Sequence, residues 1–263
     1  MIGQNKIIRR LNSYTIENFP KSNLLIGEKG CGKHSLVQLA CNKLNVPMIE
    51  ITHSLSDEFI TDLYTRTERV VYIIDINALA KSSRYVNKEN TILKFVEEPP
   101  INAVIFILAE YDSQVIDTIK NRCIIWQFKP YDLKTLKEFK NLDNDLLYSL
   151  LNTPGKLLNY KTEDSVDYAK LIDICKLIIE NIDRANISNT LSLDRHLENF
   201  SLEDFLKCLK LLVYNNYMKS EFDNRYWKAF ELTKQFINRS IILNINEQQV
   251  FDEYLLRLKQ LYD

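Results

Sequence analysis

The sequence predicts an α/β fold, in which helices cover a parallel sheet in the first half of the chain and helices alone form the second half. Up to about residue 130, short and continuous apolar segments alternate with segments of helical periodicity. Such segments are typical of parallel strands, because both faces of a parallel sheet are buried. After Pro130 the apolar residues recur only at helical spacing.

The expected strands are short and apolar, and they are 23–26, 47–52, 70–76, 103–109 and 123–128. The helices expected between them are 35–44, 56–67, 88–96 and 115–121. Pro99 and Pro100 end the helix at 88–96. In the second half the expected helices are 133–139, 145–151, 166–182, 201–217, 227–237 and 247–261. Ser201 and Asp204 approximate a capping box at the start of one of them.

Composition excludes several classes of protein. With 263 residues, of which 46% are hydrophobic and 26% are charged, the chain is globular and long enough for about two domains. The first ten residues contain no apolar segment typical of a signal peptide, and no apolar segment approaches the ~20 residues of a membrane span. We therefore expect a cytoplasmic protein with no membrane partner. The net charge of −1 gives no overall attraction to nucleic acid.

The five cysteines are widely spaced and form no C-x-x-C pair. Unpaired thiols are typical of cytosolic proteins, and structural zinc sites usually contain such a pair. The sequence therefore predicts neither a disulfide framework nor a bound zinc ion.

Glycine is scarce in this chain and concentrated in one place. There are 5 glycines, about 2% of the residues against a usual ~7%, and three of them lie within 27–32. The segment 27–33, GEKGCGK, has the G-x-x-x-x-G-K spacing of a phosphate-binding loop and separates an expected strand from an expected helix. Glycine lets backbone N–H groups turn toward a phosphate, and a helix N-terminus adds its positive dipole end. The residues expected to hold a nucleotide here are Gly27, Lys29, Gly30, Cys31, Gly32 and Lys33.

The groups that would support hydrolysis are incomplete. A working loop has Ser or Thr after its lysine as a magnesium ligand, whereas this chain has His34, and imidazole is a poor ligand for Mg²⁺. Ser35 has a hydroxyl, but on a helix this residue lies about 100° further around the axis than His34. Asp75 ends a buried strand, either facing a metal or serving as a strand-end cap, and Ile76 follows it in place of a glutamate. The sequence predicts an ATP site that lacks a proper magnesium ligand and a hydrolytic glutamate.

Further motifs follow one another in order over residues 1–160. They are Ile2-Gly3-Gln4, NTILKFVEEPP at 90–100, FILA at 106–109, TIKNRC at 118–123 and TPGK at 153–156. Together they resemble motifs of the AAA+ subunits of DNA polymerase III clamp loaders, most closely the delta-prime type. The corresponding family motifs are the box beside adenine, the helix end after Walker B, the sensor 1 strand, the "SRC" motif and the sensor 2 helix start.

This resemblance implies a P-loop AAA+ domain at 1–130, a small helical lid at 131–163 and an all-helical collar for oligomerisation at 164–263. It also implies that Arg122 is an arginine finger, which stabilises phosphoryl charge at the ATP of a neighbouring subunit. Lys156 would contact the γ-phosphate. The structural alternatives are an ordinary surface ion pair for Arg122 and a solvated lysine for Lys156.

The chain departs from the family pattern in several places. Glu110 stands where sensor 1 has Thr or Asn, and Asn121 replaces the serine of the "SRC" motif. The zinc-binding cysteines of many bacterial relatives are absent. The loop at 82–87 is longer than usual and has basic residues around it, which suits either phosphate contact or plain solvation.

The favoured hypothesis is a clamp-loader subunit of DNA replication that does not hydrolyse ATP and supplies Arg122 to a neighbour. Its partners would be related AAA+ subunits in a hetero-oligomeric ring, a sliding clamp, and primer–template DNA held by the whole ring. One alternative is an active AAA+ ATPase, such as the motor subunit, with His34 or Ser35 in its magnesium site. The other is a structural adaptor of the same fold that binds no nucleotide.

Overall fold

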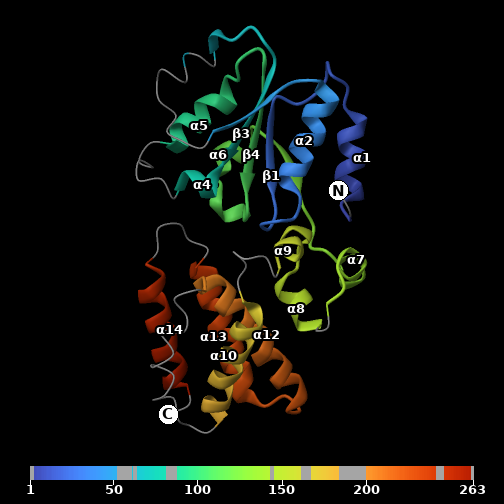
Figure 1. Ribbon diagram of the computed structural model, residues 1–263. Coiled ribbons are helices and arrows are strands. Elements are labelled where there is room, and N and C mark those ends of the chain that lie inside the picture. Colours follow the sequence, from blue (N-terminus) through green and yellow to red (C-terminus); the bar gives the residue numbers. More distant parts are fainter. Residues whose placement is uncertain are drawn as a thin grey trace. The chain divides into compact units, whose positions relative to one another are not determined.

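The computed structural model describes residues 3–51, 61, 64–80, 88–142, 145–160, 167–183, 200–240 and 246–261 (Figure 1). Packing divides the chain into two compact units. The first consists of Met1–Phe139 with Thr153–Lys156, and the second consists of Lys140–Asn152 with Leu157–Asp263. The expected three-domain division at residues 130 and 163 stays a prediction.

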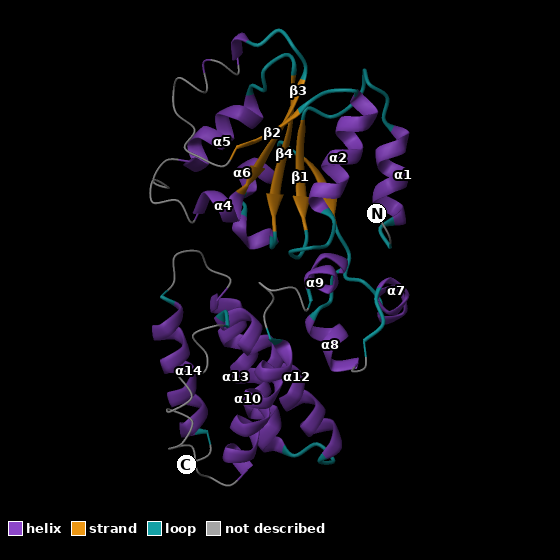
Figure 2. Cartoon of the chain, viewed as in Figure 1, coloured by secondary structure: helices purple, strands orange, loops and turns teal. Residues whose placement is uncertain are grey.

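A five-stranded parallel sheet forms the centre of the first unit (Figure 2). Its strands are β1 (Ser22–Ile26), β2 (Met48–Ile51), β3 (Val70–Asp75), β4 (Ala103–Ala109) and β5 (Ile124–Gln127). Their order across the sheet is β2-β3-β4-β1-β5, and every neighbouring pair is parallel. The predicted α/β fold is confirmed, and each strand begins and ends within one residue of its predicted range.

The carboxyl ends of the strands lie at one edge of the sheet, because all strands run in the same direction. The register pairs Ile26 with Ala109 and Asp75 with Leu108. Since β4 lies between β1 and β3, the ends of β1 and β3 are separated by two strand spacings, about 10 Å. Ligands of open α/β sheets bind at this edge. The fold therefore places the glycine loop and Asp75 on either side of the end of β4.

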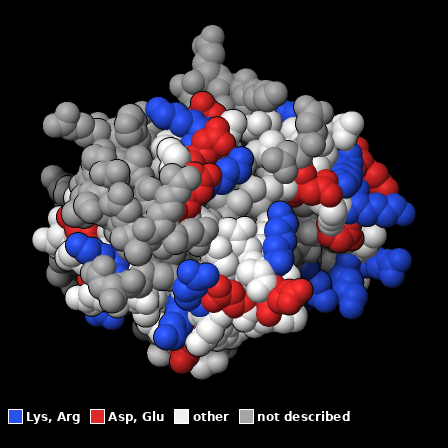
Figure 3. Space-filling view, turned by 90° about the horizontal axis from the view of Figure 1, so that it is seen from below, with Lys and Arg blue, Asp and Glu red and all other residues white. Residues whose placement is uncertain are grey.

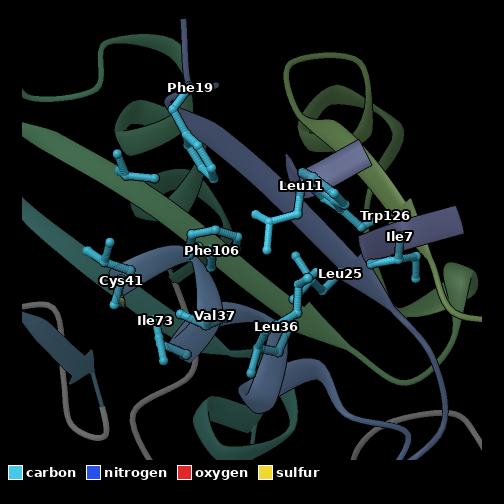
Figure 4. Close-up of a cluster of buried hydrophobic side chains, with 14 of the residues drawn as sticks. Ile7, Leu11, Phe19, Leu25, Leu36, Val37, Cys41, Ile73, Phe106 and Trp126 are labelled. Carbon is cyan, nitrogen blue, oxygen red and sulfur yellow. The ribbon is translucent and has the colours of Figure 1, made fainter. Parts of the chain in front are cut away.

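Helices cover the sheet of the first unit. They are α1 (Asn5–Ser13), α2 (Lys33–Leu44), α4 (Ile76–Ala80), α5 (Lys88–Glu97), α6 (Asp117–Lys120) and α7 (Leu133–Phe139), with a 3-10 turn η1 at Asp112–Gln114. Ile7 and Leu11 of α1 and Leu36 of α2 join a buried apolar cluster on one face of the sheet (Figure 4). Neighbouring strand residues point to opposite faces, and Ile73 and Ile74 of β3 are both fully buried. Both faces of the sheet are therefore covered.

The second unit is helical. Its helices are α8 (Asp145–Leu150), the later part of α9 (Pro154–Asn159), α10 (Tyr168–Asp183), α12 (Leu202–Lys219), α13 (Asn224–Ser240) and α14 (Glu247–Gln260). Phe205 and Phe236 meet the ring of Tyr254 edge to face, and the Tyr254 hydroxyl shares a 2.8 Å hydrogen bond with Thr233. The described residues of this unit contain no strand, as the helical spacing after Pro130 predicted.

Two helices of the first unit were not expected from the sequence. One is α1, and the other is α4, which begins at Ile76 where the sequence predicted the end of a strand. The reason at α4 is that the Asp75 carboxylate accepts the backbone N–H groups of Asn77 and Ala78 and so begins a helix. Most of the helix expected at 56–67 lies outside the described residues.

The cap predicted for α12 is present. The hydroxyl of Ser201 accepts the backbone N–H of Asp204 at 3.1 Å and donates to the Asp204 carboxylate at 2.8 Å. The side chain of Asp204 therefore completes the cap by accepting a hydrogen bond from the serine hydroxyl. Within the described ranges, no helix is long and apolar enough to cross a membrane.

Candidate nucleotide-binding site

The glycine loop curls tightly between β1 and α2. Gly30 and Gly32 have φ angles of +79° and +104°, in the left-handed region that other residues rarely adopt. A Cβ on Gly27 would lie 2.5 Å from the Cβ of Phe128, so this position also requires glycine. Gly32 is the N-cap residue of α2, and the first N–H groups of a helix have no partners within it. This backbone presents N–H donors and a positive helix end, which suits an anion such as phosphate.

The lysine of the loop turns back onto the loop itself. Lys33 has only 8% of its surface exposed. Its ammonium group donates to the backbone carbonyls of Gly27 and Glu28, the second at 3.2 Å. The ammonium group has three N–H donors, so a bound phosphate would take the third donor or replace one of these carbonyls.

The segment Thr153–Lys156, where α9 begins, packs directly against the loop. The Thr153 hydroxyl donates to the carbonyl of Lys29 at 2.8 Å, and the Gly155 N–H donates to the carbonyl of Gly30 at 2.9 Å. The two backbones are so close that a Cβ on Gly155 would lie 2.6 Å from the Cα of Gly30. The close approach of the two backbones explains why Gly155 must be glycine. The side chain of Lys29, by contrast, is exposed.

Lys156, the residue at the sensor 2 position, forms an ion pair with the loop. Its ammonium nitrogen lies 3.0 Å from Oε1 of Glu28, and the two side chains are only 16% and 25% exposed. Lys156 is therefore held against the loop rather than solvated. The sequence alone gave no reason to pair these two residues, which are 128 positions apart.

Cys31 lies at the apolar base of the loop. It is buried, and burial raises the pKa of its thiol to about 11. The Tyr131 hydroxyl donates to the backbone carbonyl of Cys31 at 2.8 Å. Cys31 therefore contributes backbone and packing to the loop, and its thiol is protonated at neutral pH.

The N-terminal segment reaches the loop through Tyr131. Gly3 has a φ of +75°, and a Cβ on it would lie 2.7 Å from the Tyr131 ring. Gln4 is buried and forms hydrogen bonds of 2.8 Å and 3.3 Å to the backbone of Lys129. Ile2, the first residue of the expected adenine-flanking box, lies outside the described residues.

The expected magnesium positions have other contacts. His34 and Ser35 are exposed, and Nε2 of His34 lies 3.6 Å from the carboxylate of Glu50 on β2. Oδ1 of Asp75 accepts two backbone N–H groups as the cap of α4. Ile76, at the position of the hydrolytic glutamate, is 3% exposed. The strand-end cap considered for Asp75 is thus formed.

Gln114 joins the ends of β3 and β4, and sequence reasoning missed it. Its side-chain oxygen accepts the N–H groups of Glu110 and Tyr111 at 2.9 Å and 3.1 Å, and its amide donates to Oδ1 of Asn77 at 2.9 Å. Glu110 directly follows β4, so its backbone lies at the carboxyl edge between the glycine loop and Asp75. No sequence pattern marks Gln114, because its partner Asn77 is 37 positions away.

Arg122 follows α6 and is exposed at the surface of the unit. Its Nη2 lies 2.8 Å from Oε1 of Glu97, and its Nη1 donates to the carbonyl of Thr118 at 2.9 Å. The Arg122 and Glu97 side chains are 41% and 38% exposed. Within the described part of the chain, the polar contacts of the Arg122 side chain go to these two residues and not to the glycine loop.

Comparison with known families gives a match to part of the first unit. A family model described as DNA polymerase III, delta subunit, matches residues 42–132. The chain resembles clamp-loader AAA+ subunits. The matched segment is about a third of the chain and contains Asp75, Glu97 and Arg122, but not the glycine loop. No curated protein matches the chain.

Solved structures are similar only at a distance. A DNA polymerase III gamma subunit-related protein of Thermotoga maritima is 15% identical, with a TM-score of 0.48 and coverage of 99% of this chain and 100% of the other. The RuvB Holliday junction branch migration motor of the same organism is 16% identical, with a TM-score of 0.47 and coverage of 78% and 72%. The clamp loader delta protein of Bacillus subtilis is 12% identical, with a TM-score of 0.37 and coverage of 97% and 99%.

The residues of this clamp-loader-like chain fit the phosphates of ATP better than they fit magnesium. The left-handed glycines and the N-terminus of α2 suit phosphate oxygens. Magnesium prefers oxygen ligands, whereas His34 offers an imidazole and one oxygen of Asp75 is engaged in capping α4. If ATP binds, the loop backbone would hold its phosphates, and the ammonium group of Lys33 would donate to them as well.

Proposed function

We propose that this chain is a subunit of a DNA sliding-clamp loader that does not hydrolyse ATP itself and acts on a neighbour's ATP through Arg122. The observation that carries the proposal is a contrast between two charged groups. Lys33 is buried and satisfied by carbonyls of its own loop, whereas Arg122 is exposed and tethered only by surface contacts.

The absence of hydrolysis in the chain's own site is supported by its side chains. Hydrolysis needs a base or orienting group for the attacking water and a magnesium ion that neutralises developing charge. Here Ile76 is buried where a carboxylate would act, and His34 has replaced the hydroxyl ligand. The loop backbone would still bind nucleotide, with Lys156 near the γ-phosphate once it leaves Glu28.

The role of Arg122 in trans is supported by its exposure and chemistry. A guanidinium carries a permanent charge and a planar set of donors that matches phosphate oxygens. Arginine fingers act by stabilising the charge of the transferring phosphoryl group, and they contribute about 10³–10⁵ to the turnover rate. An arginine at the surface can meet a phosphate that another subunit holds.

Related AAA+ subunits, a sliding clamp and primer–template DNA are the partners that this proposal implies. Lysine and arginine side chains are interspersed with aspartate and glutamate side chains on the face shown in Figure 3. The net charge of the chain is −1. A protein with this net charge gains little from attracting DNA alone, so DNA would be held by the assembly as a whole.

The experiment is to purify the tagged chain from its native host with its partners and to measure the DNA-stimulated ATPase activity. Arg122→Ala is expected to remove the turnover of one ATP site, while Arg9→Ala, at an exposed arginine of α1, is expected to leave it unchanged. Unchanged activity in Arg122→Ala would contradict the proposed role of this arginine. ATP turnover by the isolated chain that Lys33→Ala abolishes would favour an active ATPase instead.

A nucleotide-free adaptor of the same fold is the second candidate. It is favoured by the segment Thr153–Lys156, whose hydrogen bonds and ion pair already satisfy Glu28, Lys29 and Gly30 of the loop. Calorimetric titration with ATP, with and without magnesium, separates the candidates. Binding that Lys33→Ala weakens supports a nucleotide-holding subunit, and no heat of binding at millimolar ATP supports the adaptor.

A further inference from the structure

Two helices bring Glu97 and Arg122 together. Glu97 is the last residue of α5, Arg122 lies two residues beyond α6, and α5 packs against α6. The guanidinium meets Oε1 of Glu97 through Nη2 at 2.8 Å and the carbonyl of Thr118 through Nη1 at 2.9 Å. Because the guanidinium is a rigid planar group, two acceptors on different elements fix both its position and its plane.

We propose that Glu97 is a positioning residue for Arg122: its carboxylate holds the guanidinium in the orientation in which it is presented to a phosphate of a neighbouring subunit. The inference rests on the proposed function, which makes Arg122 the group that meets this phosphate. Thr118 supplies a second, backbone contact that no side-chain substitution removes.

Because the pair is exposed, Glu97 can orient the guanidinium of Arg122 without preventing it from binding another partner. With 41% and 38% of the two side chains exposed, water competes for the same contacts, and exposed ion pairs add little net stability. Arg122 can therefore exchange Glu97 for a more highly charged phosphate. A free arginine side chain samples many rotamers, so even a weak tether raises the fraction of time that the guanidinium points in one direction.

The next residue in the chain provides a matched control. Glu98 is exposed, as Glu97 is, and its backbone carbonyl accepts the hydroxyl of Tyr64 at 2.7 Å. The carboxylate of Glu97, not that of Glu98, contacts Arg122. Glu97→Gln and Glu98→Gln therefore make the same change of charge one residue apart, and only the first weakens the tether.

The first test uses the isolated full-length chain and side-chain NMR of arginine. In Glu97→Gln the Nη groups of Arg122 are expected to rotate faster than in the wild type, and in Glu98→Gln they are expected to rotate at the wild-type rate. The same rotation rate in the wild type and in Glu97→Gln would overturn the proposal.

The second test uses the loader purified from the host with its partners. Glu97→Gln is expected to lower kcat of the DNA-stimulated ATPase about fivefold, or about 1 kcal/mol, with KM for ATP and the melting temperature unchanged. Glu98→Gln is expected to match the wild type. A rise in KM or a fall in melting temperature without a change in kcat would assign Glu97 a structural role and overturn the proposal.

The two failures can be told apart. If Arg122→Ala leaves the ATPase activity unchanged, the proposed function is wrong and the pair is an ordinary surface ion pair. If Arg122→Ala lowers the activity but Glu97→Gln changes neither kcat nor the rotation of the guanidinium, the proposed function stands and only the positioning role is wrong.

Discussion

Charged side chains have opposite roles in two regions of the first unit. One region is the glycine loop, and the other is the pair Glu97 and Arg122 at the ends of α5 and α6, which we call the α5–α6 edge. At the loop, Lys33 is 8% exposed, and the side chains of Lys156 and Glu28 are 16% and 25% exposed. At the edge, the side chains of Arg122 and Glu97 are 41% and 38% exposed, more than twice the exposed fraction of Lys156. A buried charge is costly unless it is satisfied within the protein, whereas an exposed one can exchange partners at low cost.

This difference indicates which site is suited to act on a partner. The charges of the loop stabilise the contact between the loop and the segment Thr153–Lys156. The charges of the edge contribute little to stability and remain accessible. Measurements of stability should therefore respond strongly to changes at the loop and weakly to changes at the edge, while the activity of an assembled loader should show the reverse.

The largest expected effect comes from filling the space between the loop and α9. Gly155→Ala would place a Cβ 2.6 Å from the Cα of Gly30, and overpacking of backbone against backbone is expected to lower the free energy of unfolding by about 3 kcal/mol. Gly32→Ala, at a position with a φ of +104°, is expected to cost about 1 kcal/mol from backbone strain. Urea unfolding measures both. Equal costs would show that α9 does not pack on the loop in solution.

Alkaline pH should weaken the base of the loop. Burial raises the pKa of the Cys31 thiol from 9.0 to about 11, so the unfolded chain loses this proton at a lower pH than the folded chain. The protonated Cys31 thiol makes its full contribution to the free energy of unfolding below pH 9. This free energy falls by about 2 to 3 kcal/mol as the pH rises toward 11. Urea midpoints from pH 8 to 10.5 should fall less steeply in Cys31→Ala than in the wild type. The same dependence of the urea midpoint on pH in both proteins would contradict the raised pKa of Cys31.

Lys33 should contribute to stability although it belongs to a binding motif. Lys33→Met removes the donor of two loop carbonyls and is expected to cost about 1 to 2 kcal/mol of unfolding free energy. Lys29→Met, at an exposed position of the same loop, is expected to be within about 0.5 kcal/mol of the wild type. A stabilising effect of Lys33→Met would mean that the ammonium group is held for a phosphate and not for its carbonyls.

The smallest effects compare the two ion pairs directly. Double-mutant cycles in urea should give a coupling of about 1 kcal/mol for Glu28 and Lys156 and about 0.5 kcal/mol or less for Glu97 and Arg122. Added salt should weaken the exposed pair more, because exposed charges are screened more effectively. Coupling of the same size and salt dependence in both pairs would remove the contrast between loop and edge.

Much of the fold could be predicted from the sequence, because its determinants are local. Continuous apolar segments fixed the strands 103–109 and 123–128 to within one residue. The glycine spacing located a loop whose backbone needs left-handed residues at Gly30 and Gly32. The missed helix α4 had a local cause as well, because the Asp75 carboxylate accepts two backbone N–H groups that follow it.

By itself, the sequence determined the parallel α/β fold, the position of the glycine loop and the absence of a glutamate after Asp75. Only the tertiary structure decided the partners of the charged groups. It turned Lys33 onto its own loop, paired Lys156 with Glu28 across 128 positions, and brought Arg122 to Glu97. The physical reason is that strands and loops follow from neighbouring residues, whereas the partner of a charge depends on which distant segments pack against each other and on how far they exclude water.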